Sequence, residues 1–498
     1  MAKQLLENYF RENSLVKQHL DSYNKFIDSG LASDYTDAGI QAVIKRFGNI
    51  QPSIEGFELK LGKVRLEKPM IVEADGSKRP IYPMEARLRN LTYAAPIILE
   101  IIPVFNGIEK PTYSEVFIGE FPVMVRSKLC HLSNLSEDEL VEHGEDANDP
   151  GGYFIINGSE RSLVSIEDLA PNRIIVSKEK DGAIITSKVF STRWGFRARC
   201  AVERTNDGNL RVVFPAAPKD LQFTSVLRAL GLETDREILA TFSQDRHVQA
   251  DILLNLEVDD VNAVKNGASA FEHIGKKVAP GQADEYRVKR SEVLIDQYLL
   301  PHIGGTPQDR LKKAYYLVKM AERAVRVAYK DIAQDDKDHY ANKRIKLSGD
   351  LMEELFRYAF QFLVKDVSYQ AGRADARGRR LIVQTLVRPD ALTDRIRYSL
   401  ATGNWIAGQT GVSQLLDRTS YLATASHLRR IISPLSRKHP HFKARDLHGT
   451  HWGKLCPNES PEGPSCALVK NLSLLCSVSI GENEEKIEAE LRKLGVTI

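Results

Sequence analysis

The chain has 498 residues, of which 42% are hydrophobic and 27% charged, as in soluble globular proteins with more than one domain. Its net charge of only +3 hides an uneven distribution. Residues 373–445 contain 14 Lys or Arg and few acidic residues, so we expect a polyanionic partner to bind the C-terminal third. Five cysteines without a CxxC pair argue against a disulfide framework and favour a reducing cytoplasm, and no apolar run is long enough to cross a membrane.

The first part of the chain changes from helical to β-type patterning near residue 55. Apolar residues at helical spacing predict a helix over residues 14–30 that stops at Gly30. The apolar run YAAPIILEIIPVF, residues 93–105, predicts a buried strand. Asn157-Gly158 lies between two β-rich runs and predicts a two-residue hairpin, because both residues accept positive φ.

The middle of the chain mixes strand and helix patterns. A polar segment with several glycines, residues 267–292, predicts a loop. Two long helices are expected over residues 310–330 and 350–367, the second with Asp350 as its N-cap. A charged amphipathic helix is expected in the last residues. The mixture predicts an α+β, multidomain fold.

Common catalytic motifs are missing from the sequence. We find no phosphate-binding Walker loop, no dinucleotide-binding glycine motif, no nucleophile elbow and no aspartate cluster suited to catalytic Mg²⁺. Four histidines fall near two cysteines and raise the possibility of a zinc-dependent hydrolase: His439, His441, His448, His451, Cys456 and Cys466. Structural zinc sites usually place ligands two to four residues apart, which the two cysteines do not. Packed histidines, or histidines near a phosphate, are the alternatives.

Basic segments in the C-terminal third alternate with aromatic residues. The segments are GRADARGRR, SHLRR and SRKHPHFKARD, and the aromatic residues are Trp405, Tyr421, Phe442 and Trp452. This composition suits contact with a phosphate backbone, because Arg binds phosphate in a bidentate manner and rings stack on bases. A solvated charged face is the alternative interpretation.

Several segments together resemble one protein family. ATGNWIAGQTGVSQLLDRTSYLATASHLRRIISPLSRK and ARDLHGTHWGKLCPNESPEGPSCALVKNLSLL closely resemble the fork region of the second-largest subunit of multisubunit DNA-directed RNA polymerases. VFIGEFPVMVRSKLCHL, GGYFIINGSERSL, LLPHIG and DDKDHYANKRIKLSGDLMEELFR are similar to its other signatures, in the right order along nearly the whole chain. The motifs resemble the archaeal form in which this subunit is encoded as two chains, whose N-terminal half is B''. A shortened form of an unsplit subunit is the alternative.

The resemblance implies a domain plan. It places a protrusion in residues 1–163 and 336–395, a lobe in 164–335, a fork in 396–480 and the start of an external region in 481–498, which joins the other half-subunit. The first fork loop is expected within residues 402–411, near the RNA–DNA hybrid. The second is expected within residues 433–443, where the downstream strands part.

The resemblance also implies a set of supporting residues and no catalytic residue in this chain. Gln414, Arg430 and Arg445 are expected to touch the hybrid and to hold phosphates in register without reading sequence. Asp417, His427 and Arg429 are expected as nearby supports. For Arg430 an internal salt bridge to Asp417 or Glu462 is the alternative.

The segment CPNESPEGPSC, residues 456–466, predicts a rigid platform. Its three prolines fix φ and Gly463 permits the bend. The resemblance implies that this platform holds Glu462 opposite Arg445. The two cysteines are interpreted as small packed thiols. The second fork loop, SPLSRKHPHFKA, departs from the Gly-rich form expected of the family, and Ser460 replaces the usual Thr.

The family's reaction is templated addition of ribonucleotides to an RNA 3′ end. The resemblance implies that Mg²⁺ is held by the largest subunit, that this chain binds no cofactor or metal and that it is inactive alone. The implied partners are the largest subunit, the C-terminal half of B, the DNA template and the RNA–DNA hybrid, with no membrane. The rival hypothesis from a different class is a free-standing nucleic-acid-binding protein.

Overall fold

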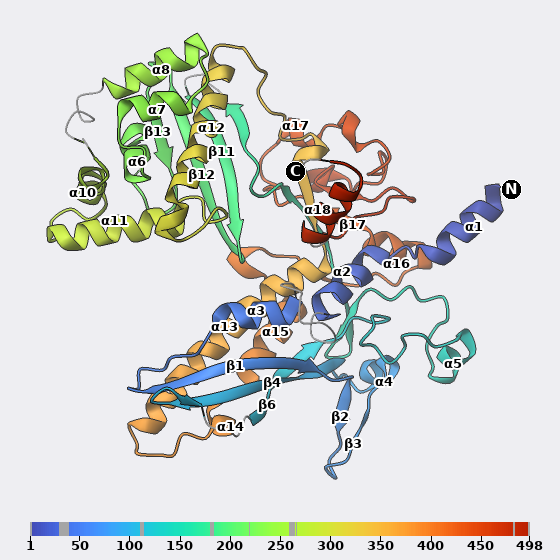
Figure 1. Cartoon of the computed structure of the whole chain (residues 1–498). Helices are drawn as coiled ribbons and strands as arrows, with labels where there is room; N and C mark the ends of the chain where they lie inside the picture. The colour runs from blue at the N-terminus through green and yellow to red at the C-terminus, as the bar shows by residue number, and fades with distance from the viewer. Residues whose placement is uncertain are drawn as a thin grey trace. The chain divides into compact units, whose positions relative to one another are not determined.

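The computed structural model of the protein describes residues 2–28, 39–109, 114–179, 184–218, 220–257, 264, 266–481 and 484–496. The chain divides into two compact units, which Figure 1 colours along the sequence. The first unit is Met1–Asp168 with Ile345–Ile498, and the second is Leu169–Arg344. Each has its own hydrophobic cluster and both helices and strands, so the predicted α+β, multidomain fold is confirmed. The range expected for the lobe overlaps the second unit, and the named domains stay predictions.

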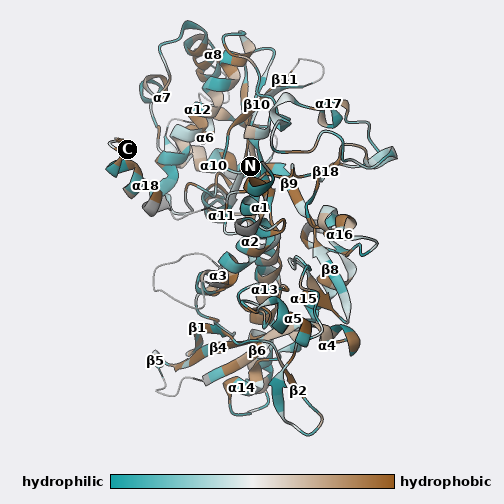
Figure 2. Ribbon diagram, turned by 90° about the vertical axis from the view of Figure 1, so that its right-hand side faces the viewer, coloured by the Kyte–Doolittle hydropathy of each residue, from teal (hydrophilic) through white to brown (hydrophobic). Residues whose placement is uncertain are grey.

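The first unit is built on a four-stranded antiparallel sheet of β1 (Phe57–Leu66), β4 (Ala94–Phe105), β5 (Ile108–Glu109) and β6 (Ser114–Pro122). The central strand β4 pairs with each of the other three. Its alternate residues Ile97, Leu99 and Ile101 are buried, as a two-residue period requires. Hydrophobic and hydrophilic residues are interspersed along β1 and β4 (Figure 2). The strand predicted within residues 93–105 is confirmed. A separate hairpin joins β2 (Met70–Val72) and β3 (Lys78–Pro80).

Helices pack around the long helix α13 in this unit. The helices of the unit are α1 (Ala2–Glu12), α2 (Lys17–Asp28), α3 (Gly39–Phe47), α4 (Pro83–Leu88), α5 (Glu137–Glu142), α13 (Ser348–Asp375), α14 (Val383–Leu386), α15 (Asp390–Thr402), α16 (Tyr421–Leu428), α17 (Phe442–Arg445) and α18 (Glu484–Lys493). Buried residues three or four apart on α13, such as Leu351, Leu355 and Ala359, face α2, α3 and α15. The helix predicted within 14–30 is confirmed as α2, and its expected stop at Gly30 lies outside the described residues.

The start of α13 differs from the prediction. Asp350 is not the N-cap: that position is Leu347, and Asp350 lies three residues further on. Its carboxylate accepts a hydrogen bond from the Leu347 N–H at 3.0 Å. The helix therefore begins earlier than its polar residue suggests, because the carboxylate reaches back to a free N–H of the first turn.

Short strands far apart in sequence bring residues expected in the fork next to the hairpin at Asn157-Gly158. β7 (Phe154–Ile156) and β8 (Ser159–Leu163) form the predicted two-residue hairpin, with Asn157 at φ 49° and Gly158 at φ 76°. β16 (Ser413–Leu415) pairs with β8. A second sheet orders β15 (Lys343–Lys346), β9 (Ser165–Leu169), β17 (Arg430–Ile432) and β18 (Val469–Asn471). Strands β8 and β9 thus pair with strands about 250 to 266 residues later in the chain.

The second unit packs helices on a five-stranded antiparallel sheet. Its strands are β10 (Ile175–Lys178), β11 (Ile184–Arg193), β12 (Phe196–Thr205), β13 (Leu210–Val213) and β14 (Leu221–Gln222). Its helices are α6 (Phe223–Ala229), α7 (Asp235–Thr241), α8 (Arg246–Leu256), α10 (Gly267–Val278), α11 (Asp284–Tyr298) and α12 (Arg310–Ala328). The loop predicted for residues 267–292 is wrong. It forms α10 and most of α11, because Asn266 caps α10 and the apolar residues Phe271 and Ile274 pack into the core.

None of the helices in the described ranges combines the length and apolar character that crossing a bilayer requires.

Candidate nucleic-acid interface

Gln414 is held in place by two neighbours. It lies on β16, opposite Ser162 of β8, and its Nε2 donates to the Gly411 carbonyl at 3.0 Å. The imidazole of His427, on α16, lies 3.1 Å from the Gln414 Oε1 through its Nε2. The other ring nitrogen of His427 accepts the Asp417 N–H at 3.1 Å. Because that nitrogen accepts, Nε2 carries the proton and donates to Gln414, so His427 is a neutral positioning group.

The charge state of His427 follows from its surroundings. Burial, followed by the positive charge of Arg430, lowers the pKa of His427 to about 4, while Asp417 acts in the opposite direction. The Asp417 carboxylate accepts from the Thr419 hydroxyl at 2.6 Å and from the Thr419 N–H at 2.9 Å, and these bonds lower the pKa of Asp417. At neutral pH the cluster therefore holds a neutral His427, an anionic Asp417 and a cationic Arg430.

Arg430 lies beside a polar surface pocket of about 450 Å³. It begins β17, where it pairs with Asn471 of β18, and its side chain is half-buried. The pocket lining includes Gln414, Ser426 and Glu459 as well as Arg430. Within the described residues Arg430 makes no ion pair with Asp417 or with Glu462. The internal salt bridge considered as its alternative is therefore not formed, and Arg430 is one of the residues that line the pocket.

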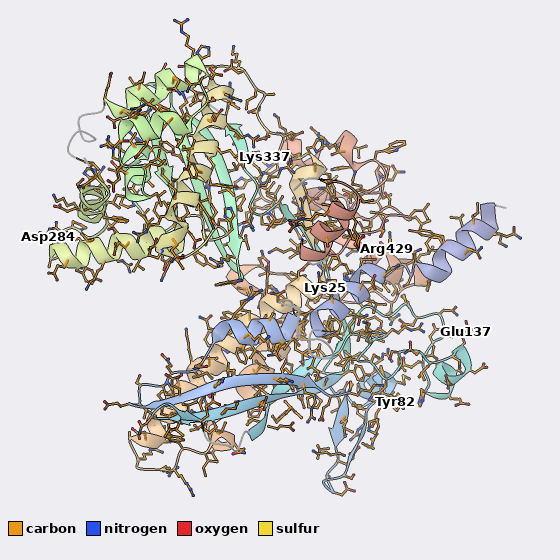
Figure 3. All side chains as sticks on the ribbon, viewed as in Figure 1. Lys25, Tyr82, Glu137, Asp284, Lys337 and Arg429 are labelled. Atoms are coloured by element: carbon orange, nitrogen blue, oxygen red, sulfur yellow. The ribbon has the colours of Figure 1, made fainter. Side chains whose placement is uncertain are left out.

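Arg429 has the opposite orientation from its neighbour. Its guanidinium donates to the Leu15 carbonyl at 2.8 Å and to the Ser473 and Leu474 carbonyls at 2.6 and 3.3 Å. Burial lowers the pKa of Arg429. The side chain, labelled in Figure 3, joins the N-terminal segment to the segment after β18. Arg429 therefore connects these two segments inside the protein.

Arg445 joins residues 439–440 to the proline-rich segment 456–466. It ends α17 and donates to the Pro440 carbonyl and to the Cys466 carbonyl, both at 2.7 Å. Glu462 is exposed, and in the described part of the chain it forms no ion pair with Arg445. The structure thus does not form the expected contact between them, because main-chain carbonyls on both loops occupy the guanidinium.

The segment 456–466 is tied down by hydroxyl groups. The Ser460 Oγ donates to the Val469 carbonyl at 3.1 Å and accepts the Ala467 N–H at 2.7 Å. The Ser426 hydroxyl donates to the Glu459 carboxylate. The interpretation of both cysteines as packed thiols is wrong for Cys466, which is exposed, whereas Cys456 is half-buried. Among the described residues no three His, Cys, Asp or Glu side chains are grouped as metal ligands, so the zinc hypothesis gains no geometric support.

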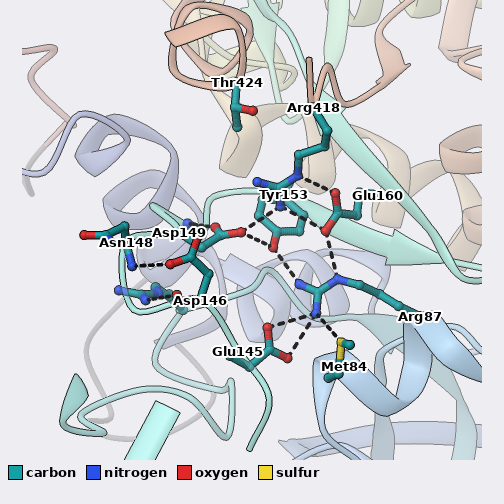
Figure 4. Close-up of polar contacts among 12 residues, drawn as sticks. Met84, Arg87, Glu145, Asp146, Asn148, Asp149, Tyr153, Glu160, Arg418 and Thr424 are labelled. Atoms are coloured by element: carbon teal, nitrogen blue, oxygen red, sulfur yellow. Dashed lines mark hydrogen bonds and ion pairs between the residues drawn. The ribbon is translucent and has the colours of Figure 1, made fainter. Parts of the chain in front are cut away.

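A network of charged residues surrounds Tyr153, and no sequence pattern predicts it (Figure 4). Arg87 of α4 donates to both Glu145 oxygens at 2.9 and 3.0 Å, to Glu160 at 2.8 Å and to the Tyr153 hydroxyl at 2.7 Å. Arg418, four residues after Gln414, donates to the same Glu160 at 2.6 Å and to Asp149 at 2.7 Å.

The opposite charges in this network stabilise one another. Burial alone would disfavour the charge of Arg418, but its bonds to Glu160 and Asp149 raise the Arg418 pKa above its ordinary value. Burial and the nearby Asp149 raise the pKa of Tyr153, which stays a neutral hydroxyl. The segment GGYFIINGSE contains Tyr153 and Glu160, yet no spacing in the sequence indicates partners that lie more than 250 residues away.

Comparison with known proteins gives a consistent result over nearly the whole chain. The sequence model of the family described as RNA polymerase beta subunit matches residues 14–394, and that of RNA polymerase Rpb2, domain 3, matches residues 414–478. The chain is 49% identical to DNA-directed RNA polymerase subunit Rpo2N of Methanococcus vannielii, over 100% of this chain and 99% of that protein. It is also 49% identical to Rpo2N of Methanocaldococcus jannaschii, with the same coverage. It is 48% identical to subunit Rpo2 of Saccharolobus solfataricus over 99% of this chain and 43% of that longer protein.

Proposed function

Because the chain belongs to the RNA polymerase beta subunit family and is a subunit of DNA-directed RNA polymerase, we propose that it forms one side of the DNA cleft and the fork near the active centre. We infer further that it is the N-terminal half of an archaeal split second-largest subunit, B''. In this proposal it acts in the cytoplasm and contributes no catalytic residue of its own.

One observation carries the proposal: two hydrogen-bond donors line one polar pocket, and neighbouring groups orient the first of them. The Gln414 amide is oriented by His427 and Gly411, and the Arg430 guanidinium is free of a carboxylate partner within the described chain. Such donors suit phosphate and sugar oxygens, which position a nucleic acid without reading its sequence. Prior orientation lowers the entropic cost of each contact.

The rest of the reaction is assigned to other chains. The catalytic Mg²⁺ is placed on the largest subunit, as the family resemblance implies, and this chain binds no cofactor. Its partners are the largest subunit, the C-terminal half of B, the DNA template and the RNA–DNA hybrid. The role of this chain is to hold the hybrid in register while another chain performs the chemistry.

The experiment is RNA extension by polymerase reconstituted with Gln414→Ala or with Arg430→Gln, on a preassembled template and RNA primer. We expect slower extension and faster loss of the hybrid, with unchanged subunit assembly on gel filtration. Arg236→Gln, at an exposed position of the second unit that does not line the pocket, serves as the control. Wild-type extension and hybrid retention in both pocket variants would contradict the proposal and leave a binding role elsewhere on the chain.

A further inference from the structure

Four arginines gather where α13 ends. Arg373 lies in the last turn of α13, and Arg377, Arg379 and Arg380 follow it. Gly378 has a left-handed φ of 62°. The Arg379 N–H donates to the Ala374 carbonyl at 2.9 Å and the Gly378 N–H to the Asp375 carbonyl at 2.8 Å. This is the hydrogen-bond pattern of a Schellman helix end, which turns the chain back on itself.

The turn brings the arginines around one hollow. A surface pocket of about 350 Å³ is lined by all four of them, together with the Gln370 amide and the Thr385 hydroxyl. All four side chains are exposed. No carboxylate lines this pocket, and within the described ranges none of the four guanidinium groups takes part in an ion pair.

A neighbouring arginine does form an ion pair in this region. Arg388 pairs with the Asp366 carboxylate of α13, yet that carboxylate does not line the pocket. Like charges held around one hollow repel one another, and an anion between them would relieve that repulsion. Guanidinium groups are suited to bidentate contact with phosphate oxygens. The Gln370 amide has a second N–H to add a weaker donor, whereas the Thr385 hydroxyl donates to the Ile382 carbonyl at 2.8 Å.

We propose that this arginine pocket binds phosphate groups of the backbone of duplex DNA, at a place separate from the fork. The inference rests on the proposed function, because a cleft wall has DNA beside it. No aromatic ring lines the pocket, so it lacks the stacking platform that single strands require. The contact is therefore to phosphates and is independent of sequence.

The test compares the double variant Arg377→Gln/Arg380→Gln with the wild type. Binding of the full chain and of the reconstituted polymerase to a labelled 25-base-pair duplex is measured at several salt concentrations. We expect the slope of log affinity against log salt to fall in magnitude by about 2, since each lost phosphate contact removes about 0.9. The double variant to Lys keeps both charges and should keep the wild-type slope.

A matched control variant and competing polyanions test whether the effect is specific to this pocket and to duplex DNA. Arg236→Gln with Arg290→Gln removes the same charge from exposed positions of the second unit and should leave the slope unchanged. The inference would be overturned if the Arg377→Gln/Arg380→Gln variant had the same salt slope as wild type. It would also be overturned if the control double variant lost as much of the slope. The inference would also be overturned if tripolyphosphate or polyglutamate displaced the labelled duplex from wild-type protein as well as unlabelled duplex does at the same charge concentration. Such displacement would assign the pocket to free phosphates or to an acidic protein.

The design separates this inference from the proposed function. If Gln414→Ala and Arg430→Gln both leave RNA extension and hybrid retention unchanged while the Arg377→Gln/Arg380→Gln variant still has a reduced salt slope, the fork proposal fails and the arginine pocket stands. If Arg430→Gln behaves as expected and the pocket slope is unchanged, the inference alone fails. Thermal melting of each variant confirms folding, which should be retained because the substituted side chains are exposed.

Discussion

Two adjacent arginines illustrate how orientation decides a residue's role. Arg430 faces the pocket, whereas Arg429 donates to three main-chain carbonyls inside the protein. Their charges are identical and their sequence context, SHLRR, does not separate them. The strand β17 does, because it begins at Arg430 and turns successive side chains to opposite sides.

We predict opposite consequences for the two substitutions. Arg430→Gln should lower the salt dependence of nucleic-acid binding by about one phosphate contact, with little change in stability. Arg429→Gln should instead cost about 2 to 4 kcal/mol of unfolding free energy, because three main-chain carbonyls lose a charged donor that is itself buried. Salt titration and chemical denaturation measure the two effects. A wild-type salt response in Arg430→Gln would count against its contact with phosphate.

Arg445 leads to a second prediction at the residue scale. Arg445→Ala should slow RNA extension with little loss of assembly, because residues 439–440 and Cys466 lose the guanidinium that joins them. Glu462 should be energetically independent of it. A double-mutant cycle with Glu462→Ala is expected to give a coupling below about 0.5 kcal/mol. A larger coupling would restore the ion pair that the structure does not form.

At the scale of elements, two neutral histidines hold α16. His19 of α2 is buried and its Nε2 donates to the Leu428 carbonyl at 2.7 Å, while His427 binds Asp417 and Gln414. Burial lowers the pKa of His19 to about 4, with Arg429 adding to the effect and the Leu428 bond opposing it. Both histidines therefore have a folded pKa near 4 and an unfolded pKa near 6.5.

These depressed pKa values predict an acid-sensitive fold. Between pH 6.5 and 4 the unfolded chain binds protons that the folded chain does not, so stability is full above pH 6.5 and falls as pH is lowered toward 4. The loss should be on the order of 3 kcal/mol per histidine at most. Unfolding by urea at pH 7 and at pH 4.5 measures it. His427→Gln should remove part of the pH dependence, and an unchanged dependence would contradict the assignment.

Sequence patterning predicted elements whose cause is local. Asn157-Gly158 formed its hairpin because two positive φ values are needed at neighbouring positions, and residues 93–105 formed a strand because their alternation fits a buried sheet. Asp350 was placed three positions too early in its helix, since the carboxylate caps the backbone from within the first turn. Residues 267–292 were predicted as a loop because polar residues mask the few apolar positions that pack in the core.

The candidate site, too, could be predicted from the sequence only in part. Gln414, Asp417, His427 and Arg430 could be selected by resemblance, and the structure does bring them together around one cluster. Arg87 could not be selected, because its partners come from strands and loops that fold against it from distant positions. Long-range ion pairs leave no periodic signal along a chain.

At the scale of the whole molecule, the two units have separate cores. The hydrophobic cluster of the first unit and that of the second share no residue. The ends of the second unit meet each other, because the Ala170 N–H donates to the Asn342 carbonyl at 2.9 Å. A unit whose ends are joined in this way, and which has its own core, meets the physical conditions for independent folding.

We therefore predict that the units unfold as separate transitions. Leu317→Ala, in α12, should lower only the transition of residues 169–344, and Leu351→Ala, in α13, only the other, each by about 2 to 5 kcal/mol for a fully buried leucine. Urea denaturation followed by hydrogen exchange and mass spectrometry assigns each transition to its unit. The excised fragment 169–344 should itself unfold cooperatively, with the midpoint of its transition in the full chain. If either substitution shifts both transitions equally, the two cores form one cooperative unit, and the fragment should then fail to fold alone.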